Sequence, residues 1–430
     1  MPSIDPAAAQ SADAPKSTLM PMAVIGGMFF IFGFVTWLNG PLISFVKLAF
    51  TLDDVSAFLV PMAFYMSYFF LALPAAAILK RTGMKRGMAL ALLVMAVGTA
   101  LFGQFIEMHI FPAALVALFI IGAGLAILQT ASNPYISILG PIDSAAQRIA
   151  FMGICNKFAG ILAPIIIGHL VLNGMGELSD RVAATTDAVA RQALLDNFAH
   201  KIYVPYLCMA VLLAMLALAV VRSPLPEISD RANESHIGKD KGKTIFQHTG
   251  LWLGVLCLFF YMGVEVMAGD AIGTYGHSFG LPLDQTKFFT AFTLIAMLVG
   301  YVAGLIAIPR FISQQRYLAW SAILGVVLTV GAFLTKGYVS VGFVAALGFA
   351  NAMMWPAIFP LGIQGLGRHT ETGSAIMVMG IAGGAIIPQL FAWLKATHDF
   401  QLVFLVLMVP AYLYILFFAL FAERRSVRAG

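Results

Sequence analysis

Twelve runs of mostly apolar residues, each long enough to cross a membrane, follow one another along this chain. A membrane helix needs about 20 such residues, because it rises about 1.5 Å per residue through a hydrocarbon core about 30 Å thick. The sequence therefore predicts an all-α polytopic membrane protein with twelve transmembrane helices. They are expected near residues 20–45, 55–79, 87–106, 110–139, 148–173, 203–222, 249–275, 288–309, 317–335, 338–366, 373–394 and 401–422.

Composition supports this prediction, since 60% of the residues are hydrophobic and only 10% are charged. An ordinary soluble domain has about a quarter of its residues charged. A soluble helical protein would also show polar stripes at a period of 3.6 residues, and most of these runs have none. We therefore expect the lipid bilayer to surround most of the chain.

The charged and sulfur-containing residues exclude several other classes of protein. The net charge of +5 comes from basic residues scattered over short loops, which does not indicate a nucleic-acid partner. The three cysteines lie inside apolar runs, without the close pairing of a zinc or redox site. No nucleophile–base cluster or phosphate-binding Gly-x-x-x-x-Gly-Lys-Ser/Thr motif is present, so we expect neither an enzyme nor a nucleotide-driven pump, and no metal or cofactor.

Orientation follows from the distribution of lysine and arginine, which favours the cytoplasmic side of a membrane. Alternate loops are rich in these residues, and the loops between them carry fewer, often beside aspartate. We expect a multi-pass protein of a bacterial cytoplasmic membrane with both termini in the cytoplasm. The loops assigned to that side carry Lys80, Arg81, Lys85, Arg86, Arg148, Arg310, Arg316, Arg368, Arg424, Arg425 and Arg428.

Two long polar connections and a polar N-terminus divide the chain. Residues 1–17 predict a disordered cytoplasmic tail, and residues 18–222 a first six-helix bundle. Residues 174–202 within it predict an extracytoplasmic segment with a short solvated helix. Residues 223–248 predict a cytoplasmic linker, which leads to a second six-helix bundle and a cytoplasmic tail at residues 249–430.

The two halves also resemble each other, which is typical of transporters built from repeats. Phe29-Phe30 and Gly33 match Phe259-Phe260 and Gly263 at one constant offset, and on that alignment Gly40 lies opposite Asp270. Aligning Pro134 with Pro356 places Gln129 opposite Asn351. These prolines are predicted to interrupt the fourth and tenth spans.

Several amides lie within the predicted spans: Asn39, Gln129, Asn133, Asn156 and Asn351. Gln129 and Asn133 are four residues apart, so a helix places both on one face. Amides in membranes often join helices by hydrogen bonds, and this reading stays open for each of them. Their concentration in the first and fourth spans favours a central cavity, where amide donors and acceptors match the spacing of sugar hydroxyls.

Three charged residues also lie within the predicted spans. An ionised group at the bilayer centre costs about 2.5–3.5 kcal/mol on insertion scales and usually faces a cavity or a partner. Lys157 and Glu265 are near mid-membrane, and Asp270 is closer to the extracytoplasmic end. We expect these residues to couple transport to an ion, or Glu265 simply to neutralise Lys157.

Three aromatic residues, Trp37, Tyr261 and Trp355, lie beside the polar positions rather than at the membrane edges where interfacial anchors concentrate. Their ring faces can stack on the C–H faces of a pyranose. Core packing is the alternative for each of them.

Several of these segments resemble the fucose, galactose and glucose symporters of the major facilitator superfamily. The fourth-span signature is Leu128-Gln-Thr-Ala-Ser-Asn-Pro-Tyr-Ile-Ser-Ile-Leu-Gly-Pro141. Further similar segments are Phe29-Phe-Ile-Phe-Gly-Phe through Asn39, Tyr261-Met-Gly-Val-Glu265, and Trp355-Pro-Ala-Ile-Phe-Pro-Leu-Gly-Ile363. The resemblance covers the chain beyond residue 17 and implies two pseudo-symmetric bundles that open alternately to either side of a sugar site.

At the ion-coupling positions, different residues of this chain resemble different branches of the family. The proton-handling carboxylates of the fucose members correspond here to Gly40 and Gln129. Gln129 and Glu265 resemble the glucose/galactose branch, where sodium coupling is known, whereas Lys157 and Leu38-Asn-Gly-Pro-Leu42 are similar to members handling N-acetylglucosamine.

The resemblance thus implies a monomeric importer of a hexose or N-acetylglucosamine that uses sodium or proton symport. Efflux of small metabolites or drugs, and a non-transporting membrane sugar sensor, remain alternatives.

Overall fold

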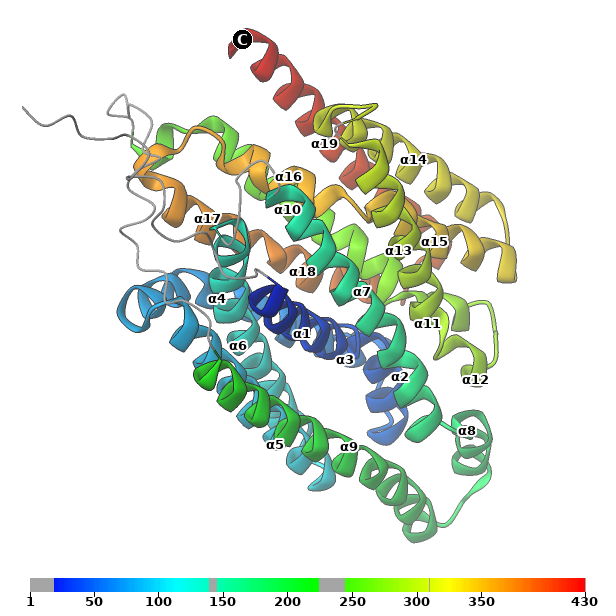
Figure 1. Ribbon diagram of the computed structural model, residues 1–430. Coiled ribbons are helices and arrows are strands. Elements are labelled where there is room, and N and C mark those ends of the chain that lie inside the picture. The colour runs from blue at the N-terminus through cyan, green and yellow to red at the C-terminus, as the bar shows by residue number, and fades with distance from the viewer. Residues whose placement is uncertain (1–18, 139–144, 224–243, 309, 430) are drawn as a thin grey trace, which may run out of the picture.

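The computed structural model describes residues 19–138, 145–223, 244–308 and 310–429, and all regular structure within them is helical (Figure 1). The first half contains α1 (Leu19–Thr36), α2 (Asn39–Ala49), α3 (Asp54–Ala57), α4 (Leu59–Thr82), α5 (Met84–Glu107), α6 (Phe111–Ile138), α7 (Ala145–Leu170), α8 (Met175–Ala184) and α9 (Ala188–Arg222). The second half contains η4 (Ile245–Gln247), α10 (Thr249–Gly269), α11 (Ile272–His277), α12 (Leu283–Thr286), α13 (Phe289–Ala307), α14 (Gln314–Leu334), α15 (Gly337–Asn351), α16 (Met354–Ile363), η5 (Gly367–His369), α17 (Thr370–Met379), η6 (Gly380–Ala382), α18 (Gly383–Leu394) and α19 (Phe400–Ala429).

The described residues contain eleven helices that are long and apolar enough to cross a membrane, and α15 with α16 forms a twelfth span bent by 41°. The predicted set of twelve spans is confirmed. The segment at 174–202 differs from its prediction, because only α8 is a short separate helix. From Ala188 the chain already belongs to α9, which continues without a break for 35 residues.

Two spans break at places that their prolines explain. Proline has no N–H, and its ring clashes with the carbonyl four residues earlier. Pro41 is four residues after Trp37, where α1 gives way to α2, and Pro356 is four residues after Ala352, where α15 gives way to α16. Pro134 does not have this effect, because α6 stays helical through it to Ile138. The predicted interruption of the fourth span is therefore wrong, and that of the tenth is confirmed.

The twelve spans form two six-helix halves that lie side by side (Figure 1). Within the first half α5 packs on α6 and α9, and within the second α14 packs on α19. The halves meet mainly where α7 packs on α13 and where α4 packs on α17 and α18. The centre of the molecule is therefore an interface between the halves.

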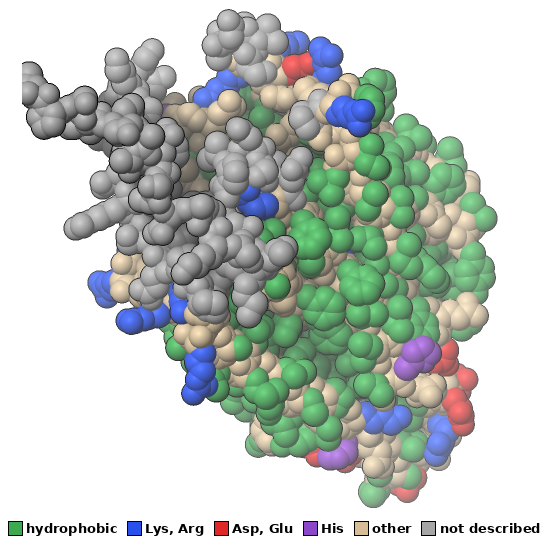
Figure 2. Space-filling view, viewed as in Figure 1, with side chains coloured by type: hydrophobic (Ala, Val, Ile, Leu, Met, Phe, Trp, Pro, Cys, Tyr) green, Lys and Arg blue, Asp and Glu red, His purple; other side chains and the backbone are tan. Residues whose placement is uncertain are grey.

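The two ends of the helical array differ in charge, as expected for a protein oriented by its basic loops. One end of the array, here called the basic end, has lysine or arginine at nearly all of its charged positions. It is formed by residues 80–86, 222–223, 310–316, 364–369 and 423–425. The opposite end, here called the α8 end, is formed by residues 50–54, 107–110, 171–201, 277–287, 335–336 and 395–399 and mixes acidic and basic groups. Figure 2 shows a broad hydrophobic band between these ends. The predicted tail at 1–17 and most of the linker at 223–248 lie outside the described residues.

Candidate functional site

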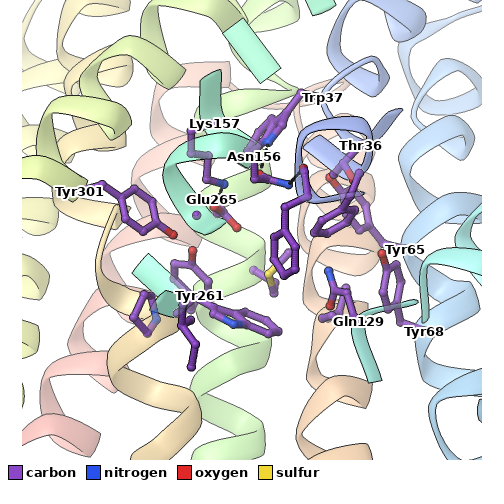
Figure 3. A pocket seen from close by; sticks show the side chains of 18 residues that line it. Thr36, Trp37, Tyr65, Tyr68, Gln129, Asn156, Lys157, Tyr261, Glu265 and Tyr301 are labelled. Carbon is purple, nitrogen blue, oxygen red and sulfur yellow. Dashed lines mark hydrogen bonds and ion pairs between the residues drawn. The ribbon is translucent and has the colours of Figure 1, made fainter. Parts of the chain in front are cut away.

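A cavity lies at the interface between the two halves, near the middle of the helical array (Figure 3). The space between its side chains is about 790 Å³ when the part that is open to solvent is counted. Helices α1, α4, α6 and α7 line it from the first half, and α10, α13, α16 and η6 from the second. The wall combines aromatic rings with a few polar groups, which is the usual composition of a site that orients a polar ligand.

A buried ion pair crosses the cavity wall from one half to the other. The Lys157 ammonium on α7 lies 2.8 Å from Glu265 Oε1 on α10, and each side chain is only 8% exposed. Removing two charges from water costs several kcal/mol each, so such a pair persists only if both members stay together. The sequence left two roles open for Glu265, ion coupling or neutralisation of Lys157. This geometry directly accounts for the second role.

Trp37 and Asn156 hold the lysine in place from the first half. The Lys157 Nζ lies 4.3 Å from the centroid of the Trp37 ring, an arrangement that attracts a cation to the π face. The Trp37 Nε1 donates a hydrogen bond to Asn156 Oδ1 at 3.4 Å, and Asn156 Nδ2 donates to the Phe29 carbonyl at 3.5 Å. This contact needs α1 close to α7, and Gly33 allows it, because a Cβ there would lie 2.0 Å from the Asn156 carbonyl oxygen.

The first half also contributes Gln129 and two tyrosines to the cavity wall. Gln129 on α6 lines the cavity, and its Oε1 is buried without a hydrogen-bond partner among the described residues. Tyr65 and Tyr68 on α4 are three residues apart and therefore share a helix face toward the cavity (Figure 3). A buried amide oxygen without a donor costs free energy, so a ligand hydroxyl there would satisfy it.

The second half contributes mainly aromatic surface. Tyr261 on α10 and Trp355 on α16 line the cavity with ring centroids 6.5 Å apart. Trp355 stacks on Phe359 at 5.7 Å with an interplanar angle of 17°, which fixes its orientation. Tyr301 on α13 also lines the cavity, beside the Lys157–Glu265 pair (Figure 3).

Three further sequence candidates have described side chains, and none of the three lines the cavity. Asn39 and Asn351 are buried, but neither lines the cavity, and Asn351 Oδ1 accepts a hydrogen bond from the Tyr412 hydroxyl at 2.8 Å. Asp270 is also buried outside the cavity lining, between the halves, where the Tyr65 hydroxyl donates to its Oδ2 at 3.1 Å. The side chain of Asn133, on α6, lies outside the described residues.

Polar contacts between the halves close the α8 end. Lys395 from the second half lies 2.5 Å from Asp54 of the first, and Lys47 binds the same carboxylate. Nearby, Gln389 Nε2 donates to the Val55 carbonyl at 3.0 Å. Asp53 starts α3 by accepting a hydrogen bond from the Ser56 N–H, and hydrogen bonding with Ser56 lowers the pKa of the Asp53 carboxyl.

A second set of contacts closes the same end beside α8. Lys287 donates to the Leu172 carbonyl at 2.8 Å across the interface, and it also pairs with Asp284 at 2.9 Å. Asp284 Oδ2 in turn accepts from the Gly176 N–H at 3.2 Å. The structure is therefore a state in which the cavity is shut toward the α8 end.

The sequence reasoning missed the tyrosines of the cavity, namely Tyr65, Tyr68 and Tyr301. Each lies well inside a span, away from the membrane edges where tyrosine is enriched, and that position was the available signal. Among the described residues, no group of three or more His, Cys, Asp or Glu side chains is arranged to hold a metal ion.

Two six-helix halves that meet around a central polar cavity, closed at one end, define a secondary transporter of the alternating-access class. Comparison with known proteins gives the family. The model of the Major Facilitator Superfamily matches residues 25–388. The chain is 31% identical over 400 residues to the glucose/galactose transporter of Brucella abortus biovar 1 (strain 9-941), covering 92% of each chain.

A further relative, known both by sequence and by a crystal structure, belongs to the fucose branch. The chain is 27% identical over 398 residues to the L-fucose-proton symporter of Escherichia coli (strain K12), covering 90% of this chain and 89% of the relative. The crystal structure of the transporter FucP in the outward conformation superposes with a TM-score of 0.75 at 25% identity, covering 95% of this chain and 99% of that one. The chain therefore belongs to the Major Facilitator Superfamily and, within it, to the fucose, galactose and glucose symporter family.

Proposed function

We propose that this protein imports a small neutral sugar of the glucose or galactose type into a bacterial cell together with a proton, and that it works as a monomer. The observation that carries the proposal is the cavity between the halves, where Gln129, Asn156 and the Lys157–Glu265 pair face aromatic rings. The named activities of the relatives support the ligand class: glucose and galactose for the Brucella protein, and fucose with a proton for the Escherichia protein.

The chemistry of the cavity suits a ring that carries many hydroxyl groups. Each sugar hydroxyl both donates and accepts, and the cavity offers amides, tyrosine hydroxyls, an ammonium and a carboxylate that supply both kinds of partner. The unpartnered Oε1 of Gln129 is an acceptor ready for a sugar O–H. The rings of Trp355 and Tyr261 provide a flat apolar surface for the C–H face of the ring.

The charge of the two ends supports one orientation of the protein in the membrane. Lysine- and arginine-rich loops favour the cytoplasmic side, so we assign the basic end to the cytoplasm of an inner membrane and the α8 end to the outside. The closed contacts at the α8 end then represent a state of the cycle that is shut toward the outside. Reopening of these contacts completes the cycle.

The test is uptake of radiolabelled sugar into proteoliposomes, with a proton gradient or a sodium gradient applied separately and a panel of competing sugars that includes N-acetylglucosamine. We expect accumulation driven by a proton gradient, and competition by glucose or galactose. Outward movement of drugs without sugar competition would favour an efflux transporter, and sugar binding without counterflow would favour a sensor. Either result would overturn the proposal.

A matched pair of variants ties the activity to the cavity. Gln129→Ala removes an amide from the cavity wall, whereas Gln104→Ala removes an exposed amide from α5. We expect weaker sugar competition only in Gln129→Ala. An equal effect of both changes would place the sugar elsewhere.

A further inference from the structure

Asp270 is a buried carboxyl group that the Lys157–Glu265 pair leaves without a cation. It lies at the break between α10 and α11 and is 1% exposed. Its Oδ2 accepts a hydrogen bond from the Tyr65 hydroxyl of the other half at 3.1 Å. Its Oδ1 has no hydrogen-bond partner among the described residues.

The groups that face this carboxyl do not neutralise an ionised form. Tyr65 of α4 donates one hydrogen bond, and the backbone of Gly40 on α2 lies against it. Glu265 on its own span adds a second negative charge nearby, and Lys157 of α7 is engaged with that glutamate at 2.8 Å. No lysine, arginine or histidine nitrogen in the described part of the chain lies within ion-pair distance of Asp270.

An ionised carboxylate in such a place is costly, because burial removes its hydration and no cation of the described residues lies within ion-pair distance to compensate the charge, even with the hydrogen bond from Tyr65. The carboxyl is stable in this closed arrangement only while it holds a proton or a bound cation. A neutral carboxylic acid needs one acceptor and one donor, far less than a carboxylate needs. The closed interface is therefore built for the uncharged form of Asp270.

The position of Asp270 links both sides of the membrane. A Cβ on Gly40 would lie 3.3 Å from the Asp270 Cα, so the two halves touch directly at this point. Parting of the halves at the α8 end would expose the carboxyl to that side. Tyr65 lines the central cavity and donates to the carboxyl, so in the closed state one side chain contacts both Asp270 and the cavity.

We propose that Asp270 binds the coupling proton and that its protonation permits closure of the α8 end. This inference rests on the proposed proton-coupled import and assigns its proton site. The carboxylate takes one proton from the outside while the α8 end is open, and the neutral acid is then buried as the halves close. Loss of that proton past Tyr65 into the cavity leaves a buried unpaired charge, which drives the α8 end to reopen.

Transport assays test the proton site. Asp270→Asn keeps the shape of the side chain and cannot ionise, and Asp180→Asn removes an exposed carboxylate of α8 as the matched control. We expect Asp270→Asn to lose sugar accumulation against a gradient while it retains sugar counterflow, which also shows that it folds. Asp180→Asn should behave as the wild type. Proton-driven accumulation by Asp270→Asn would overturn the inference.

A conformational measurement tests the closure step. Spin labels at Val55→Cys and Gln389→Cys, in a chain with its three native cysteines replaced, report the separation of the halves at the α8 end. We expect the distance to lengthen as the pH rises in the wild-type background and to show no dependence on pH with Asp270→Asn. Titration that persists in that variant would overturn the inference, as would closure by sodium with no dependence on pH.

The Tyr65→Phe variant tests whether the hydrogen bond from Tyr65 to Asp270 affects proton binding or has only a structural role. The hydroxyl stabilises the ionised carboxylate, so its removal should shift the midpoint of the distance titration to higher pH by up to about one unit. An unchanged midpoint would contradict the role of Tyr65 as partner of the proton site. If the wild type shows no proton-driven accumulation at all, the proposed function itself fails, whatever the variants do.

Discussion

Breaking the Lys157–Glu265 pair from one side should destabilise the protein far more than removing both charges. The Nζ and Oε1 atoms are 2.8 Å apart and both side chains are 8% exposed. At an effective dielectric constant of about 20, such charges attract by roughly 6 kcal/mol. Removing one partner of a buried pair typically costs about 3–5 kcal/mol, because the other charge is left without compensation.

We expect Glu265→Gln and Lys157→Met each to lower the free energy of unfolding by about 3–5 kcal/mol, and the double variant to recover most of that loss. Denaturant titration of the purified protein in detergent measures these differences. The exposed pair Arg316–Glu423 is the control, since its Arg316→Gln variant should cost less than about 1 kcal/mol.

Two results would refute this reasoning. Single variants as stable as the wild type would mean that the pair is not held together as two charges. A double variant no more stable than the singles would mean that Glu265 and Lys157 each have separate structural partners. The same variants also bear on coupling: those that still transport sugar should keep the proton dependence, since the proton is assigned to Asp270.

Further variants test the cavity, the helix contact and the closed end. Gln129→Ala should weaken sugar binding roughly two- to tenfold, measured as the competition constant in counterflow, because it removes one buried hydrogen bond. Gly33→Ala should lower stability by about 1–3 kcal/mol in denaturant titration, because the new Cβ would meet the Asn156 carbonyl at 2.0 Å, whereas Gly27→Ala has open space and should not. Lys395→Gln removes an ion pair between the halves, so spin-label distances at the α8 end should shift toward the open form; an unchanged distribution would show that this pair does not hold the end closed.

The fold was predictable because a bilayer restricts the chain so strongly. Every backbone polar group inside the membrane must be satisfied internally, so long apolar runs become helices and their number follows from the sequence. Proline allowed one break to be anticipated: Pro356 ends a helix four residues earlier, as expected. Pro134 does not break its helix, and α6 continues through it to Ile138. Whether a proline bends or breaks a helix depends on what the neighbouring helices can accommodate, and the sequence of one span does not contain that information.

The cavity residues that are too polar for lipid were predictable from the sequence. Those whose position depends on helix packing were not. Gln129, Asn156, Lys157 and Glu265 are too polar for lipid, and all four line the cavity. Asn351 is equally polar, yet it accepts a hydrogen bond from Tyr412 and does not line the cavity, because the packing of the helices decides which face turns toward the cavity. The partnership of Tyr65 with Asp270 joins residues 205 positions apart, and no local pattern reports such a contact.

The central claim is that one sugar and one proton cross the membrane together through the cavity between the halves. The most direct measurement records sugar entry and internal pH at the same time in proteoliposomes that start with no ion gradient. The account predicts that an inward sugar gradient acidifies the interior, with one proton entering per sugar, and that Asp270→Asn moves sugar without this acidification. Sugar entry with no proton movement in the wild type would contradict the account.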